Sequence, residues 1–164
     1  MKAVNRRRMH GVYVVEFAII GVLLFTLLFG VLEMGRLLFT VNALDEVVRR
    51  GARLAAVCNV TDLEQEKVKQ RAIFNNDGED DSPLIANLTT SDLTLAYLNE
   101  NGAEVLNPTS DNGFRAIRYV QLRVDNFTFD LLIPVLGGNI DLPVFRSTLP
   151  RENLGRSVEG DTEC

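Results

Sequence analysis

Few of the residue types that enzymes use for catalysis occur in this chain. Its 164 residues include one histidine, His10, and two cysteines, Cys58 and Cys164. There is no Gly-x-Ser-x-Gly sequence and no phosphate-binding loop. Carboxylates alone can form an acid–base pair, but here they fall in predicted loops or at exposed strand positions. We therefore expect no enzymatic activity, no small-molecule substrate, no cofactor and no metal ion.

Basic residues are scarce in the larger, C-terminal part of the chain. Residues 59–164 contain nine Lys and Arg against 18 Asp and Glu, whereas residues 1–11 contain four basic residues and no acidic one. Residues 12–58 hold four of each, and the whole chain carries a net charge of −5. An acidic domain without a basic stripe argues against nucleic-acid binding.

Charge is almost absent from a long apolar run, Val12 to Leu32. These 21 residues contain one charged side chain, that of Glu16. A helix of this length, rising ~1.5 Å per residue, can cross a hydrocarbon core of ~30 Å. The run is longer than the core of a secretory signal, and no small-residue cleavage site follows it. The basic leader, residues 1–11, should stay in the cytoplasm, which places the acidic domain outside.

Glu16 is costly to place in this run, because an ionised carboxylate in hydrocarbon costs at least ~2.5 kcal/mol. Charges inside membranes usually have a partner, so we predict a functional role for Glu16. The alternative is that Glu16 lies near the membrane edge and reaches headgroups or water.

The N-terminal sequence resembles a known processing signal. A short basic leader that ends in glycine, followed by an apolar helix with glutamate at its fifth position, is similar to the prepilin signal of the type IV pilin superfamily. More narrowly, the chain resembles the TadE-like pseudopilins of bacterial tight-adherence (Flp) pilus systems from about Arg6 to Cys58, and again at Ser147–Glu152 and in the late cysteine. Four motifs carry the N-terminal resemblance: Gly11-Val-Tyr-Val-Val-Glu16-Phe17-Ala18, Phe29-Gly30-Val-Leu-Glu33-Met-Gly35-Arg36, Asn42-Ala43-Leu44 and Arg50-Gly51-Ala52-Arg53.

This resemblance implies a minor pilin or pseudopilin that helps to assemble a Flp-type pilus from the bacterial inner membrane. A prepilin peptidase would cut between Gly11 and Val12, and the further partners would be other pilin subunits and the assembly platform. Cleavage would free the amine of Val12, which Glu16 of a neighbouring subunit can bind when helices pack side by side. We therefore assign Glu16 and the adjacent Phe17 to assembly and register. The alternative is an uncleaved single-pass protein whose periplasmic domain binds an envelope or pilus-platform component.

A second apolar pattern extends the helix beyond the membrane. From residue 37 to residue 57, apolar side chains recur every three or four positions, at Leu38, Val41, Leu44, Val48, Ala52 and Ala55. This predicts one helix from Val12 to Val57, with residues 12–35 in the membrane. Its outer half, residues 36–58, must bury its apolar side, and we expect it to pack on the later part of the chain.

Charged side chains on this helix have the spacing of stabilising pairs. Asp45–Arg49 and Glu46–Arg50 are four residues apart with the acid first. Glu33 and Arg36 are three residues apart at the outer end of the apolar run and can pair there. A contact between subunits and a routine boundary pair both remain open for Glu33 and Arg36.

Residues 59–164 predict a small domain, so the expected fold is α+β and pilin-like, with the long helix packed on an antiparallel sheet. The strongest strand signal places Val120, Leu122 and Val124 on its dry face. In chain order we first predict a helix at Asp62–Phe74, with Asp62 as N-cap and Leu63, Val68, Ala72 and Ile73 buried. The predicted strands are Leu93–Tyr97, Phe114–Phe127 and an edge strand at Ile140–Leu149 that contains Pro143. Between and after them we predict a turn at Asn101–Gly102, a loop at Pro108–Gly113, a helical turn or bulge at Leu131–Leu136 and a loop-like tail at Pro150–Cys164.

The two cysteines both lie in the part predicted to be outside the cell membrane, where disulfides persist. An internal Cys58–Cys164 bridge would close a loop of about 105 residues, which is worth ~4.7 kcal/mol in the chain-entropy model. Two free thiols or an intermolecular bridge are the alternatives.

Overall fold

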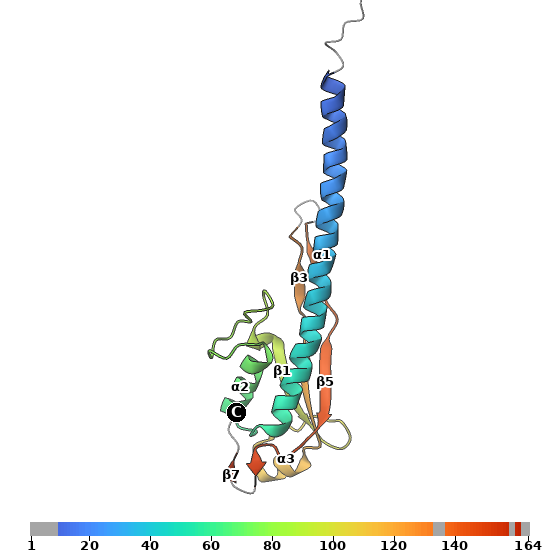
Figure 1. Ribbon diagram of the computed structural model, residues 1–164. Helices are drawn as coiled ribbons and strands as arrows, with labels where there is room; N and C mark the ends of the chain where they lie inside the picture. Colours follow the sequence, from blue (N-terminus) through green and yellow to red (C-terminus); the bar gives the residue numbers. More distant parts are fainter. Residues whose placement is uncertain (1–9, 133–136, 158–159, 162–164) are drawn as a thin grey trace, which may run out of the picture.

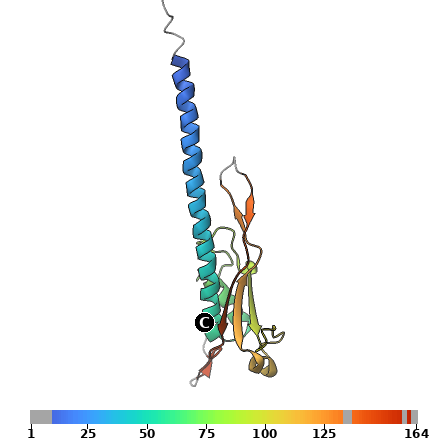
Figure 2. The ribbon, with the colours of Figure 1, turned by 90° about the vertical axis from the view of Figure 1, so that its right-hand side faces the viewer.

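A long helix dominates the computed structural model, which describes residues 10–132, 137–157 and 160–161. Helix α1, His10–Val57, is continuous over 48 residues. Its N-terminal half projects beyond the rest of the molecule, and its C-terminal half packs on a small sheet (Figures 1 and 2). The predicted single helix is confirmed, as is the α+β class.

The sheet against α1 has three antiparallel strands in the order β1-β2-β5. Strand β2, Tyr119–Val124, is central; it pairs with β1, Leu93–Leu98, and with β5, Phe145–Pro150. The dry face predicted for β2 is confirmed, since Val120, Leu122 and Val124 are at most 1% exposed. This face lies on the C-terminal half of α1.

Within the described residues, two hairpins and three short helical elements accompany this sheet. The first hairpin joins β3, Thr128–Asp130, to β4, Asn139–Asp141, and runs beside α1 toward its projecting half (Figures 1 and 2). The second joins β6, Arg156–Ser157, to β7, Gly160–Asp161. The helical elements are α2, Asp62–Ala72, the 3-10 turn η2, Thr90–Asp92, and α3, Asp111–Ala116.

The predicted strand Phe114–Phe127 was too long at both ends. Its first residues belong to α3, and so does the end of the predicted loop Pro108–Gly113. Ser110 caps this helix, because its hydroxyl accepts a hydrogen bond from the Gly113 N–H, and the Phe114 N–H donates to the Ser110 carbonyl. The capped helix includes Phe114 to Ala116, which we had predicted as the start of the strand.

The predicted strand Ile140–Leu149 is in fact two strands, β4 and β5, with Pro143 in the connection between them. Proline has no N–H for a ladder, which explains the break. The expected edge position is confirmed for β5. The tail is not all loop, because it forms β6 and β7 and buries Leu154 at 1% exposure. Of the predicted turn Leu131–Leu136, residues 133–136 lie outside the described residues.

Helix α2 begins where we predicted, but its cap and part of its face differ. Thr61, not Asp62, is the N-cap, with its hydroxyl accepting from the Glu64 N–H at 3.4 Å. Val68, Ala72 and Ile73 are buried as expected. Leu63 is 65% exposed, because the buried side of α2 is formed by Glu64, Val68 and Ala72 instead.

The buried side of α1 is made largely of small residues. Leu44, Val48, Ala52 and Ala55 are buried as predicted, but Leu38 is 55% exposed. Gly51 marks the closest approach: a Cβ added there would lie 2.1 Å from Leu122 Cδ2 on β2. Small side chains therefore let α1 lie directly against the sheet.

Candidate functional site

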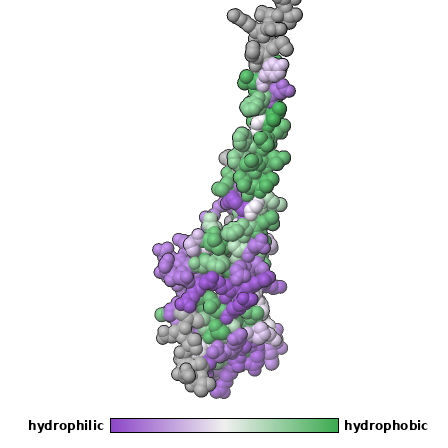
Figure 3. All heavy atoms as spheres, viewed as in Figure 1, coloured by the Kyte–Doolittle hydropathy of each residue, from purple (hydrophilic) through white to green (hydrophobic). Residues whose placement is uncertain are grey.

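The stretch of α1 from Val12 to Leu32 is largely exposed in the described structure. Its large apolar side chains from Val12 to Leu32 are between 45% and 78% exposed, with Leu28 and Phe17 at the two extremes. Figure 3 shows this apolar column above a domain whose surface is mostly hydrophilic. By length and composition alone, α1 is able to cross a membrane.

The predicted processing position lies in the first turn of α1. Gly11 is exposed, and a Cβ added there would meet no atom within 4 Å. Val12 is 65% exposed. The Gly11–Val12 bond is accordingly accessible.

Glu16 stands on this apolar surface without a partner among the described residues. Its side chain is exposed and makes no ion pair or hydrogen bond with any of them. Phe17, next to it, is the most exposed of the large apolar side chains of α1, at 78%. A carboxylate isolated among apolar groups would be strongly stabilised by a cation from another molecule.

At the other end of the exposed half, Glu33 and Arg36 form an ion pair, 2.5 Å between Oε1 and Nη1. The Glu33 side chain is buried, with 9% exposure, whereas that of Arg36 is 40% exposed. The Arg36 guanidinium also lies over the ring of Phe129 on β3, 5.0 Å from its centroid. The pair therefore ties α1 to the β3–β4 hairpin, a contact that sequence spacing did not reveal.

Further down α1, the two predicted pairs differ. Asp45 and Arg49 form an ion pair at 2.8 Å. Arg50 lies instead over the ring of Phe74, 5.1 Å from its centroid, and the Glu46–Arg50 pair is not among the ion pairs within the described residues. The face of the partly buried Phe74 ring gives Arg50 a cation–π contact that no local spacing encodes.

Cys58 follows directly after α1 and is 1% exposed. The returning tail runs alongside it: the Leu154 N–H donates to the Ala56 carbonyl and the Gly155 N–H donates to the Val57 carbonyl. Cys164 lies outside the described residues. The predicted Cys58–Cys164 disulfide therefore stays a prediction, favoured by the course of the tail.

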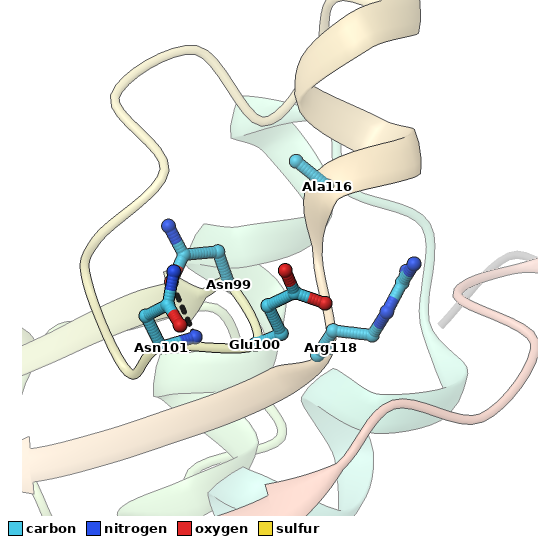
Figure 4. A pocket seen from close by; sticks show the side chains of 5 residues that line it. All are labelled: Asn99, Glu100, Asn101, Ala116 and Arg118. Carbon is cyan, nitrogen blue, oxygen red and sulfur yellow. Dashed lines mark hydrogen bonds between the residues drawn. The ribbon is translucent and has the colours of Figure 1, made fainter.

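A hollow on the domain surface lies between the turn after β1 and the end of α3 (Figure 4). It is lined by Asn99, Glu100, Asn101, Ala116 and Arg118. Its polar groups serve the turn after β1, where the Asn99 side chain accepts from the Asn101 N–H at 2.9 Å, and Arg118 donates to the carbonyls of its own chain segment. Within the described residues, no group of three or more His, Cys, Asp or Glu is placed to hold a metal ion.

Comparison with known proteins bears on the same N-terminal segment. Residues 11–53 match the model of the family described as TadE-like protein. The chain carries a TadE-like segment. The matched residues run from the predicted processing glycine to the part of α1 that lies on the sheet, and they confirm the resemblance drawn from the motifs. This family is structural and associated with Tad pilus systems. No curated protein and no solved structure matched the chain.

The structure adds residues that the sequence did not point to. Phe129 contacts Arg36, and the Asn87 side chain donates to the carboxylate of Asp130 at 2.7 Å, so α1 and the loop that contains Asn87 both hold the hairpin. Glycine weakens an isolated helix, but at position 51 the missing side chain is what makes room for Leu122. These are contacts between distant parts of the chain, and no local pattern predicts them.

Proposed function

We propose that this protein is a minor pilin or pseudopilin that helps to assemble a tight-adherence pilus. One observation supports this most directly: the TadE-like segment, residues 11–53, includes a helix stretch from Val12 to Leu32 that is apolar and exposed. Such a surface must be covered by lipid, by other helices, or by each in turn. A subunit that waits in a membrane and then joins a helical assembly needs a surface of this kind.

In the proposed topology, the basic leader is cytoplasmic and α1 crosses the bacterial inner membrane, with the folded domain in the periplasm. The four basic residues before Val12 favour this orientation. Prepilin peptidase then removes residues 1–11, and the pilus assembly platform receives the mature chain. Residues 12–35 serve as the transmembrane segment, and residues 59–164 form the periplasmic domain.

Glu16 would set the register between neighbouring subunits. Cleavage after Gly11 leaves a positively charged α-amine on Val12, and a carboxylate in hydrocarbon gains most from a cation of that kind. When two α1 helices lie side by side, Glu16 of one can pair with the Val12 amine of the other. Slipped arrangements leave both charges unpaired in an apolar surrounding, so pairing selects one register.

The first test is the mass and N-terminal sequence of the protein from its own cells, with and without prepilin peptidase. A chain that begins at Val12 only when the peptidase is present supports the proposal. A chain that retains the leader in both strains refutes processing and favours a permanent membrane anchor with a periplasmic binding domain.

The second test separates assembly from processing. We expect Glu16→Ala to be cleaved normally but lost from sheared pilus fractions, because the Val12 amine then has no partner. Glu46→Ala is the matched control, since Glu46 is an exposed carboxylate on the lower half of the same helix. Normal incorporation of Glu16→Ala would contradict the register role.

A further inference from the structure

The β3–β4 hairpin lies at the level where the membrane-spanning part of α1 ends. Arg36 is over Phe129, and Leu37 and Leu131 pack against the same hydrophobic cluster. Beyond Phe129 the hairpin continues toward the projecting half of α1 (Figures 1 and 2), and the Leu131 N–H donates to the Gly138 carbonyl. This pair is two residues past Phe129, or about 7 Å at ~3.3 Å per residue.

Along α1, about 7 Å corresponds to roughly four to five residues at ~1.5 Å each. The hairpin therefore rises from the level of Arg36 to about that of Leu32, which is the last residue of the apolar run. Leu132, on this rising part, is 68% exposed. From Leu131 to Ile140 the sequence carries no charged residue.

The opposite side of α1 remains apolar at this same level. Met34, Leu38 and Phe39, beyond Glu33, are 57%, 55% and 52% exposed. Lipid can therefore contact this side of α1 both before and after the position of the Glu33–Arg36 pair along the helix. The ion pair itself is on the covered side: Glu33 is 7% exposed and its partner Arg36 is held by Phe129.

We propose that the β3–β4 hairpin is a second membrane contact of this chain, placing Leu132 in the interface of the leaflet next to the domain and shielding the Glu33–Arg36 pair from lipid. A charge pair at this depth is tolerated when it is mutually satisfied and covered. The carboxylates of Asp130 and Asp141 are exposed on the hairpin and limit its depth, because they must remain among headgroups or water. Strands β3 and β4 therefore stay outside the hydrocarbon, and among the described residues it is Leu132 that reaches the interface.

This inference rests on α1 crossing a membrane, which is part of the proposed function, but not on cleavage or on pilus assembly. The sequence offers a direct probe because it contains no tryptophan. Leu132→Trp reports on the hairpin. Leu106→Trp is the matched control, since Leu106 is an 87% exposed leucine in the loop before α3, at the far end of the domain. Val22→Trp, at a 65% exposed site on α1, reports on the span itself.

Each full-length variant is reconstituted into vesicles of phosphatidylethanolamine and phosphatidylglycerol, with and without lipids brominated near the top of the acyl chain. We expect Leu132→Trp to emit at shorter wavelength than Leu106→Trp and to lose intensity with the brominated lipid, whereas Leu106→Trp is quenched by aqueous acrylamide alone. Ile140→Trp, on the paired strand and 37% exposed, repeats the measurement should circular dichroism show misfolding of Leu132→Trp.

Three outcomes would overturn the inference. Quenching of Val22→Trp but not of Leu132→Trp by brominated lipid would leave the span intact and place the hairpin in water. Protection of Leu132→Trp from both quenchers would show that another protein surface, such as a second copy of this chain, covers the hairpin. Absence of lipid quenching for Val22→Trp would refute the membrane span and the hairpin contact together.

Discussion

Replacing Gly51 by alanine tests whether α1 is held against the sheet by the absence of a side chain. Gly51 lies on the buried side of α1, and an added Cβ would be 2.1 Å from Leu122 Cδ2 and 2.9 Å from the Ala72 Cβ. Contacts below ~3 Å cannot be kept, so one partner must move. Neither partner has free space to move into, because Leu122 and Ala72 are both 0% exposed.

Two opposing effects decide the size of the change. Alanine favours the helix over glycine by ~1 kcal/mol. Overpacking a dense core costs ~1–3 kcal/mol, and two short contacts from one carbon favour the upper part of that range. We therefore expect Gly51→Ala to lower the free energy of unfolding by about 1–2 kcal/mol, although the same exchange at an open helical site would raise it.

The assay is urea unfolding of the full chain in detergent micelles, followed by near-ultraviolet circular dichroism, to which the buried Tyr97 contributes. Gly35→Ala is the control, since a Cβ there meets no atom within 4 Å, and it should be neutral or stabilising. Leu122→Ala alone should cost ~2–5 kcal/mol. The double variant, Gly51→Ala with Leu122→Ala, should cost less than the sum of the two single-variant costs, because the shortened Leu122 side chain leaves room for the new Cβ. Additive costs, or a stabilised Gly51→Ala, would refute the close approach.

Three other predictions concern the charges, the tyrosine and the tail. Burial raises the pKa of Tyr97 above its ordinary value of 10.0, so the neutral phenol stabilises the fold below about pH 10, and that contribution is lost as the pH rises further. Tyr97→Phe should therefore remove part of the fall in the free energy of unfolding at alkaline pH. An unchanged pH profile would contradict this. Arg36→Ala leaves the Glu33 carboxylate without its partner, so it should lower the free energy of unfolding, measured in urea, by about 1–3 kcal/mol and by more than Glu33→Gln does. Equal costs of the two variants would mean that the pair does not hold the hairpin. Cys164→Ser should lower stability by up to about 4–5 kcal/mol if the bridge to Cys58 forms, and alkylation with and without reductant, read by mass spectrometry, should detect that bridge in the native chain.

The larger elements could be predicted from local patterns. Apolar continuity and the spacing of Leu44, Val48 and Ala52 gave one long helix, and the alternation at Val120, Leu122 and Val124 gave the central strand. Both signals depend on a residue's near neighbours in sequence, which is why they survive without knowledge of the fold. Strand ends were less predictable, because α3 is decided by a single capping hydroxyl, that of Ser110.

The candidate site likewise contains a part that the sequence predicts and a part that it does not. Gly11, Val12, Glu16 and Phe17 form one contiguous motif, and the structure leaves all four exposed, so the motif and its accessibility are consistent. The pairing of Arg36 with Phe129 joins residues more than ninety positions apart along the chain. Contacts of that length depend on how the hairpin packs, and no spacing rule encodes them.

Residue size, more than apolarity, separates the two halves of α1. Both halves are rich in apolar side chains, so apolarity alone does not tell lipid from protein. Before Thr40 the apolar residues are mostly Leu, Ile, Phe and Val, and they are exposed; from Thr40 to Val57 there is no Phe, Ile, Tyr or Met, and the buried side is mainly Ala, Val and Gly. Lipid tails adapt to any apolar shape, whereas a rigid sheet at close range accepts only small side chains. The fall in side-chain size near Thr40 therefore marks where α1 leaves its variable surroundings and meets its own domain. Leu38 faces outward because of its phase: at ~100° per residue it lies about 120° around the helix from the buried Leu44.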